Sequence, residues 1–339
     1  MNGLETGIRK TWSGAAPVAA MNKERFPMLG NRRSFAMTLL VLVAVTAGLA
    51  SEAWAGSPGD AGLLSLRLGI GAREAGMGET GVASSTGAAA VYWNPANNVF
   101  EEFDTGLVLQ HHRYLGLFNH ESAALAHRIG KGVLGVIFMG FYSDSIDRYG
   151  SEPVGVPEGS FKPYDVALGV SYAHPLGDSF AAGVNAKMIY ERIDIYSDTG
   201  FAFDFFLTHK AVIEGLVFAA SMTNVGADMM LKDEAFQLPT AVRVGAGWTP
   251  VGDLFKEKLT LAGDVVFPND TKEKAHLGAD FRLIPEFSLR LGTRINYTNQ
   301  GLTAGAGFRT GALGIDYAFG SSTIEGVDDA HKFTLNLVW

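Results

Sequence analysis

Large apolar and polar residues alternate along the chain from about Phe103 to its end, with a period of two. The alternation is clearest over residues 287–297, where one face carries Phe287, Leu289, Leu291, Ile295 and Tyr297. The opposite face carries Ser288, Arg290, Gly292, Arg294 and Asn296. Successive side chains of a β-strand point to opposite sides, so a period of two indicates strands. The pattern therefore predicts a protein built of β-strands from about residue 103 onward.

Short segments rich in Gly, Pro, Asn and Asp separate the alternating runs, as expected of turns between strands. Two clear examples are residues 175–178, which read PLGD, and residues 299–301, which read NQG. Between such breaks, strands are predicted to begin near residues 105, 121, 132, 164, 179, 200, 216, 240, 258, 274, 287, 301, 312 and 331. This gives about 14 strands, and an even number is usual in bacterial outer-membrane barrels.

Two architectures fit so many strands: an antiparallel transmembrane β-barrel and a soluble β-sandwich. A sandwich turns a charged face to water, whereas the polar faces here are mainly Gly, Ala, Ser and Asn with isolated charges. The apolar faces are rich in Phe, Leu and Tyr, which suits lipid contact around a narrow polar lumen. Lipid cannot hydrogen-bond a free strand edge, so the sheet must close. We therefore predict an all-β fold with an antiparallel barrel over residues 103–339.

The charged residues of the polar faces are predicted to point into the lumen and to pair with one another, without a catalytic role. They are Asp165, Lys187, Asp204, Arg243, Asp280, Arg282, Arg290, Arg294, Arg309 and Asp316. On the same reasoning, Leu289 and Leu291 face lipid. We expect an arginine at Leu291 to cost about 2–4 kcal/mol near the midplane, and a polar replacement of Arg290 to cost much less.

The chain ends in an alternating run that closes on an aromatic residue: Phe333, Leu335, Leu337 and Trp339. Such a final strand resembles the signal that the barrel-assembly machinery of the outer membrane recognises. We therefore expect this machinery and outer-membrane lipid to be partners of the chain.

Residues 1–55 have the order of a secretory signal peptide. Arg32 and Arg33 precede an apolar run over residues 35–50, and Ala53-Trp54-Ala55 forms a cleavage site. A transmembrane helix is the alternative, but the run has 16 residues and a spanning helix needs about 20. The region before the arginines is long, and a start at Met21 or Met28 would shorten it. We predict cleavage after Ala55 and export from the cytoplasm.

The composition excludes several classes of function. The chain has no Cys among its 339 residues, so thiol catalysis, thiolate metal sites and disulfides are excluded. A formal net charge of −8 argues against nucleic-acid binding, which needs a basic face. Motifs for dinucleotides, phosphate loops and serine nucleophiles are absent from the sequence. We expect no enzyme activity, no cofactor and no metal.

Residues 56–102 precede the first predicted strand and lack the period of two. The segment is rich in small residues such as Gly76 and Gly78, and it ends in Tyr92-Trp93-Asn94-Pro95-Ala96. Irregular backbone at membrane depth is tolerated only where protein or water surrounds it, which predicts a plug inside the barrel. Pro95 favours extended backbone at Asn94, and an Asn side chain can bond nearby backbone. We expect Asn94-Pro95-Ala96 to hold the plug against the wall near the first strand.

The segment LRLGIGAREAGMGETGVASSTGAAAVYWNPANN, residues 66–98, resembles the N-terminal signature of PorV/PorQ outer-membrane proteins, within the FadL-like superfamily. The matching elements are residues 69–73 (GIGAR), 75–78 (AGMG) and 92–96 (YWNPA). The resemblance implies a 14-stranded outer-membrane barrel with an N-terminal plug. It also implies passage of small hydrophobic molecules through the lumen. The alternative is a barrel associated with type IX secretion that binds or delivers secreted surface proteins.

Overall fold

The computed structural model describes residues 59–339 except 115, 151–154, 252–254, 256–257 and 299. The predicted signal peptide, residues 1–55, therefore lies outside the described residues, and the predicted plug is described from Gly59 onward. No helix within the described ranges is long and apolar enough to cross a bilayer.

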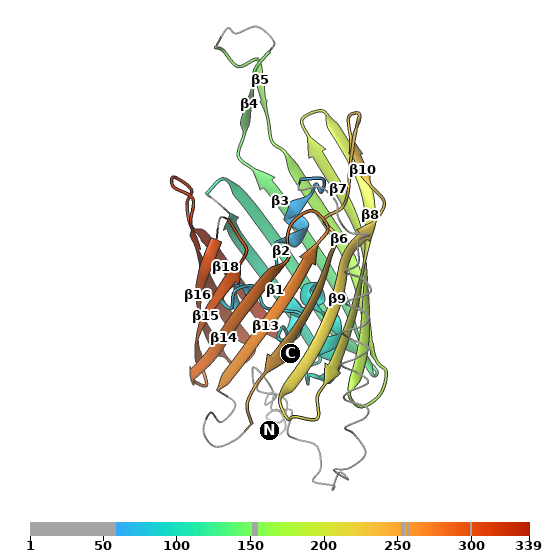
Figure 1. The fold of residues 1–339 in the computed structure, drawn as a ribbon, viewed down its shortest axis with the longest axis vertical. Coiled ribbons are helices and arrows are strands. Elements are labelled where there is room, and N and C mark those ends of the chain that lie inside the picture. Colours follow the sequence, from blue (N-terminus) through green and yellow to red (C-terminus); the bar gives the residue numbers. More distant parts are fainter. Residues whose placement is uncertain (1–58, 115, 151–154, 252–254, 256–257, 299) are drawn as a thin grey trace, which may run out of the picture.

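Fourteen strands of the described chain form one closed antiparallel barrel (Figure 1), which confirms the predicted fold class. They are β1 (Thr105–Tyr114), β2 (Phe118–Ile129), β3 (Gly132–Ser143), β6 (Tyr164–Pro175), β7 (Phe180–Ile193), β8 (Tyr196–Lys210), β9 (Leu216–Gly226), β12 (Ala241–Trp248), β13 (Leu259–Pro268), β14 (Lys274–Ile284), β15 (Phe287–Ile295), β16 (Gln300–Thr310), β17 (Leu313–Ser322) and β18 (Ala330–Val338). Each strand pairs with its sequence neighbours in the wall, and β1 pairs with β18 to close the sheet. The predicted starts differ from these by four residues at most.

Two short hairpins distinguish the ends of the barrel. β4 (Ile146–Arg148) pairs with β5 (Gly159–Phe161), and β10 (Met229–Leu231) pairs with β11 (Glu234–Phe236). Both hairpins rise from the same end of the barrel, at the top of Figure 1, which we call the loop end. At the opposite end, which we call the turn end, tight turns such as the one between β16 and β17 join the strands.

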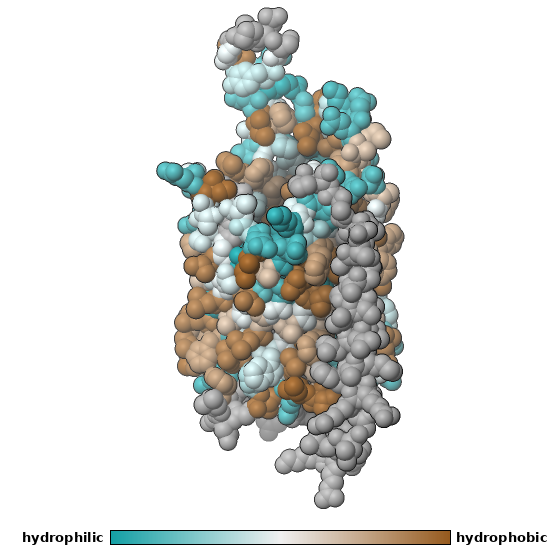
Figure 2. Space-filling view, viewed as in Figure 1, coloured by the Kyte–Doolittle hydropathy of each residue, from teal (hydrophilic) through white to brown (hydrophobic). Residues whose placement is uncertain are grey.

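The two faces of the wall differ sharply in exposure. Leu291 on β15 is 68% exposed, whereas its neighbour Arg290 is 2% exposed, because one points outward and the other into the lumen. Figure 2 shows apolar residues over much of the visible wall, with polar residues gathered towards the loop end. This outer surface suits a hydrocarbon environment.

The segment before β1 lies inside the barrel and forms short helices. In the described chain these are η1 (Leu64–Arg67), α2 (Ala72–Gly76), η2 (Gly87–Ala89), α3 (Ala90–Trp93) and η3 (Pro95–Phe100). The sequence predicted irregular backbone here. Alanine favours helix, whereas the interspersed glycines and Pro95 keep each helix short. Helices this short give no periodic pattern in the sequence, so they could not be recognised from it.

The plug runs through the whole length of the lumen. At the loop end Ala61 forms a parallel bridge with Gln237, directly after β11. At the turn end the carbonyl of Asp104 accepts a hydrogen bond from the amide of Arg128, 2.9 Å away. The apolar core therefore lies between plug and wall, where Ile70 and Val91 of the plug are fully buried.

Candidate functional site

The Asn94-Pro95-Ala96 turn ties the plug to the barrel wall. Asn94 has extended backbone, and its side-chain oxygen accepts a hydrogen bond from the Ala96 amide at 3.1 Å. Its side-chain nitrogen donates to the carbonyl of Val82 at 3.0 Å and to the hydroxyl of Thr208 at 2.8 Å. Asn94 is fully buried. One amide thus joins the turn, an earlier part of the plug and strand β8.

The position of this turn differs from the sequence expectation, which placed it near the first strand. Thr208 belongs to β8, and η3 packs chiefly against β6 and β7. The ring of Pro95 lies against Gly183 of β7, where a Cβ atom would approach it to 3.0 Å. The plug crosses the lumen before joining β1, so closeness in sequence to β1 did not place the turn beside it.

Tyr92 and Trp93 fix the plug from within. The indole nitrogen of Trp93 donates to the carbonyl of Ile70 at 2.6 Å, and the Tyr92 hydroxyl donates to the carbonyl of Leu66 at 3.0 Å. The Trp93 ring occupies the space that side chains would need at Gly69 and Gly81. These contacts fold the first part of the plug back onto α3.

Gly76 and Gly78 bring the plug backbone against the wall backbone. Gly78 has a φ of +71°, and a Cβ there would lie 2.7 Å from the carbonyl oxygen of Leu277. The Thr303 hydroxyl accepts a hydrogen bond from the Gly78 amide at 2.9 Å and donates to the Gly76 carbonyl at 3.1 Å. Only glycine combines this backbone conformation with so close an approach.

Some of the predicted lumen charges meet in an ion-pair network near the turn end. Arg290 lies 2.6 Å from Asp316 and 3.4 Å from Asp280. Asp280 also pairs with Arg73 of the plug helix α2, at 3.0 Å. Arg290 thus holds two carboxylates of the wall at once, which changes the expectation that a polar replacement there would cost little.

Other predicted charges bind the plug or each other singly. Arg243 pairs with Asp264 at 3.1 Å and donates to the carbonyl of Glu79 at 2.8 Å. Arg294 lies 3.5 Å from the Glu79 carboxylate. Lys187 lies 2.8 Å from Asp204. Arg243 and Arg294 therefore join the wall to the plug, whereas Lys187 and Asp204 pair within the wall, between β7 and β8.

The remaining predicted charges are Asp165, Arg282 and Arg309. Asp165 on β6 accepts a hydrogen bond from Ser65 of the plug at 2.9 Å. Arg282 and Arg309 are partly buried on β14 and β16, close to the turn end. Of the predicted assembly signal, Phe333, Leu335 and Leu337 lie on β18, and Trp339 follows its last residue. Phe333 and Trp339 are exposed.

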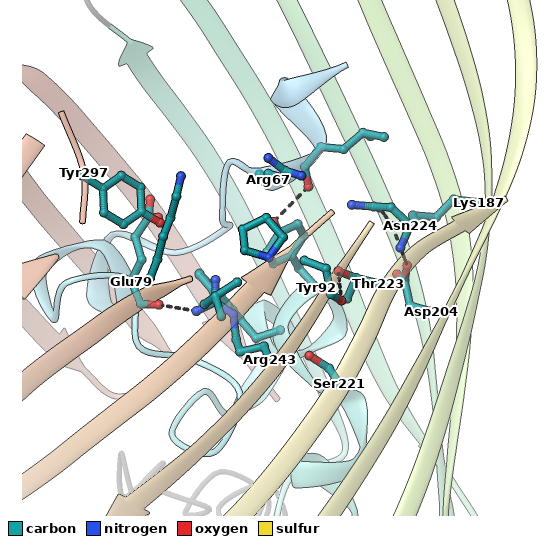
Figure 3. Close-up of a pocket in the computed structure, with 16 residues that line it drawn as sticks. Arg67, Glu79, Tyr92, Lys187, Asp204, Ser221, Thr223, Asn224, Arg243 and Tyr297 are labelled. Carbon is teal, nitrogen blue, oxygen red and sulfur yellow. Dashed lines mark hydrogen bonds and ion pairs between the residues drawn. The ribbon is translucent and has the colours of Figure 1, made fainter. Parts of the chain in front are cut away.

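A cavity of about 70 Å³ lies between the plug and the wall, lined by Trp93, Tyr92 and Arg243 among others. Figure 3 shows Glu79 and Tyr297 on one side of it, and Lys187 with Asp204 on the other. Such a space has room for about five water molecules. At this cavity, beside β8, β9 and β12, the plug leaves room for a solute.

Tyr297 follows β15 at the loop end and lines this cavity. Its hydroxyl lies 3.0 Å from a ring nitrogen of His276. Burial, reinforced by the nearby Glu79 carboxylate, raises the pKa of Tyr297 to about 12. The phenol therefore stays protonated at neutral pH and offers the cavity a neutral aromatic face.

Several residues of the site were not singled out from the sequence. Thr208 and Thr303 bind the plug through their hydroxyls, and the Lys332 ammonium donates to the Gly69 carbonyl at 2.8 Å. The alternation does place all three on inward faces. Nothing else in the sequence distinguishes the two threonines, however, because the plug atoms that they bond lie far away along the chain.

Comparison with known proteins gives a match in structure alone: no family model and no curated protein matches the chain. The toluene transporter TbuX of Ralstonia pickettii superposes with a TM-score of 0.59 and 15% identity, over 80% of this chain and 98% of its own. The monoaromatic hydrocarbon channel CymD gives 0.57 and 13%, with 80% and 98% covered. The toluene transporter TodX of P. putida gives 0.53 and 12%, with 80% and 97% covered. The chain therefore shares its barrel fold with these three proteins.

Proposed function

We propose that the protein is an outer-membrane channel of the PorV/PorQ type that carries small hydrophobic molecules, and that it is not an enzyme. The observation that carries this proposal is the shared fold, which extends over 80% of the chain and nearly all of the hydrocarbon channels compared. The signature over residues 66–98 supports the PorV/PorQ type. The apolar outer wall supports a position in the membrane.

The orientation follows from the two ends of the barrel. Outer-membrane barrels have short periplasmic turns and longer extracellular loops. The loop end, with the hairpins β4–β5 and β10–β11, would then face outward, and the turn end the periplasm. A solute would enter beside residues 61–67 and leave near Asp104.

Passage through the lumen requires the plug to shift. Ile70 and Val91 fill the space between plug and wall, and the cavity beside Trp93 has a volume of only about 70 Å³. The polar contacts between plug and wall include ion pairs such as Arg73 with Asp280, and hydrogen bonds to charged groups contribute about 1.5–3 kcal/mol each. The barrel strands pair with one another and not with the plug, so a shift of the plug would leave the closed sheet intact.

A reversible crosslink tests this role, because the chain has no cysteine of its own. An ideal Cβ at Gly106 of β1 lies 3.8 Å from the Cβ of Ala88 in the plug, a spacing typical of disulfides. The double variant Ala88→Cys with Gly106→Cys should lock the plug when oxidised. Gly320 and Ala330, also 3.8 Å apart, give a matched disulfide between two wall strands.

Toluene uptake is measured in a Gram-negative host that lacks hydrocarbon channels. We expect the native chain to raise uptake, the oxidised plug crosslink to abolish the gain, and reduction to restore it. Toluene uptake by the wall-crosslink variant should be the same before and after oxidation. A native chain that gives no uptake would contradict the proposed function, and equal uptake by the locked and released forms would contradict a moving plug.

The secretion-associated role makes a different prediction. The β4–β5 hairpin projects beyond the barrel (Figure 1) and exposes Ile146. A barrel that delivers secreted proteins would depend on such a projecting surface. Deleting residues 146–161 would then impair display of surface proteins, whereas a channel for small molecules would keep its toluene uptake.

A further inference from the structure

The cavity beside Trp93 has more positive than negative charge in its lining. Its cations are Arg67, Lys187, Arg243 and Lys274, and its anions are Glu79 and Asp204. These residues come from the plug and from β7, β8, β12 and β14, which meet only in the folded barrel. A lining of this kind suits a solute that carries negative charge.

Three of the four cations already have a carboxylate partner. Arg67 lies 2.8 Å from Asp270, which is outside the lining. Lys187 lies 2.8 Å from Asp204. Arg243 lies 3.1 Å from Asp264. Pairing leaves these three side chains fixed and close to neutral as units.

Lys274 differs from the other three. Among the described residues, its side chain makes no ion pair and no hydrogen bond. Its ammonium lies over the ring of Tyr297, 4.3 Å from the ring centre. The Glu79 carboxylate, which also lines the cavity, is paired with Arg294 at 3.5 Å. The cavity therefore presents one positive charge without a paired anion.

Apart from the amide of Asn224, the rest of the lining is apolar or carries a hydroxyl. Leu66, Val266 and Pro268 contribute apolar surface, and Ser221 contributes a hydroxyl on the side of the cavity shown in Figure 3. The volume of about 70 Å³ fits roughly five non-hydrogen atoms, judged by the space that water molecules need. One unmatched cation beside apolar surface fits a monovalent acid with a short apolar body. A dianion would need a second unmatched cation.

We propose that this cavity binds a short-chain organic acid, with the carboxylate at Lys274 and the apolar body against Leu66, Val266 and Pro268. This inference rests on the proposed function, because it names a class of solute for the same lumen. The lumen then selects acidic amphipathic solutes as they pass the plug, in addition to admitting neutral ones.

Calorimetry on the purified full chain in detergent tests the site with propionate and propionamide, which have the same size and differ in charge. We expect propionate to bind and propionamide to bind at least about tenfold more weakly, since hydrogen bonds to charged groups contribute about 1.5–3 kcal/mol. Lys274→Gln should weaken propionate binding by a similar factor. Lys131→Gln, in the exposed turn after β2, is the matched control and should bind as the native chain does.

Each alternative outcome has a definite meaning. Equal binding of propionate and propionamide to the native chain would overturn the proposal, and this comparison needs no variant to fold. Unchanged propionate binding by Lys274→Gln would also overturn it. Inorganic phosphate that binds as well as propionate would show a general oxyanion site and overturn the organic-acid assignment. If the chain raises toluene uptake but binds propionate no better than propionamide, the proposed function stands and only this inference falls.

Discussion

Thr105 and Trp339 exchange two backbone hydrogen bonds. The amide of Thr105 donates to the carbonyl of Trp339 at 2.8 Å, and the amide of Trp339 donates to the carbonyl of Thr105 at 3.0 Å. The first residue of β1 and the last residue of the chain thus complete the seam between β1 and β18. Closure of this seam removes the free strand edges that lipid could not satisfy.

Deletion of Trp339 should therefore lower the yield of folded barrel in the outer membrane. The deletion removes the two hydrogen bonds with Thr105 and the terminal aromatic residue of the proposed assembly signal. Heat-modifiable mobility on gels measures the folded fraction. Trp339→Phe keeps the backbone bonds and an aromatic end, so it should assemble normally. If the deletion variant assembles as well as the native chain, Trp339 is not part of the assembly signal.

Leu291 and Arg290 should both be sensitive to substitution, for different reasons. Leu291→Arg places a charge in lipid, at a cost of about 2–4 kcal/mol if the residue lies near the midplane. Arg290→Gln leaves Asp280 and Asp316 without their shared cation, and breaking a buried pair costs about 3–5 kcal/mol. Leu291→Met should change little. Urea unfolding in lipid vesicles measures these costs. If Leu291→Arg left the stability unchanged, the assignment of lipid-facing and lumen-facing residues on this strand would be wrong by one residue.

Gly78→Ala should loosen the plug while the barrel stays closed. The added methyl group would meet wall backbone within 3 Å, and φ there is +71°, which L side chains rarely adopt. We expect a higher conductance in planar bilayers than for the native chain. Gly159→Ala is the control, because Gly159 has no atom within 4 Å of its Cβ position. Equal conductance of the two variants would show that the Gly78 contact does not hold the plug.

Asn94→Ala should destabilise the plug more than the barrel. The change removes the bonds of Asn94 to the Val82 carbonyl and the Thr208 hydroxyl, while Asn97 still bonds both groups, so we expect a loss of about 0.5–1.5 kcal/mol per bond. Hydrogen exchange should therefore speed up over residues 82–98 and remain slow in β8. Tyr196→Phe, on the same strand but exposed, serves as the comparison. Uniform exchange across plug and wall would argue against a separate anchoring role.

Glu101, at the end of the plug, should make the stability of the folded chain depend on pH. Burial raises the pKa of Glu101 to about 7, although Lys210 nearby acts in the opposite direction. A raised folded-state pKa means that the stability contribution is complete below about pH 4.5 and is lost as the pH rises through 7. The native chain should unfold at a lower temperature at pH 8 than at pH 4, beyond the change seen for Glu101→Gln. Identical pH profiles of the two proteins would contradict this assignment.

The strands and their faces could be predicted from the sequence because both depend on local properties. A strand turns alternate residues to opposite sides, and lipid and lumen demand opposite polarity, so Leu291 and Arg290 reveal their sides without any partner. Turn residues mark the strand ends for similar local reasons. The helices of the plug escaped this reasoning because pieces as short as Ala90–Trp93 contain too few residues to show a period.

The partners inside the barrel were decided only by the tertiary structure. Asn94 bonds Thr208 across 114 residues of chain, and Arg73 pairs with Asp280 across 207. Such contacts depend on the closure of the sheet, the register of each strand and the path of the plug, and no local pattern encodes them. The sequence by itself determined a closed barrel with a polar lumen and an internal plug. The folded chain determined which lumen charges join the plug to the wall, which pair within the wall, and that Lys274 is left facing the cavity, because each pairing depends on which side chains the closed barrel brings within a few ångströms.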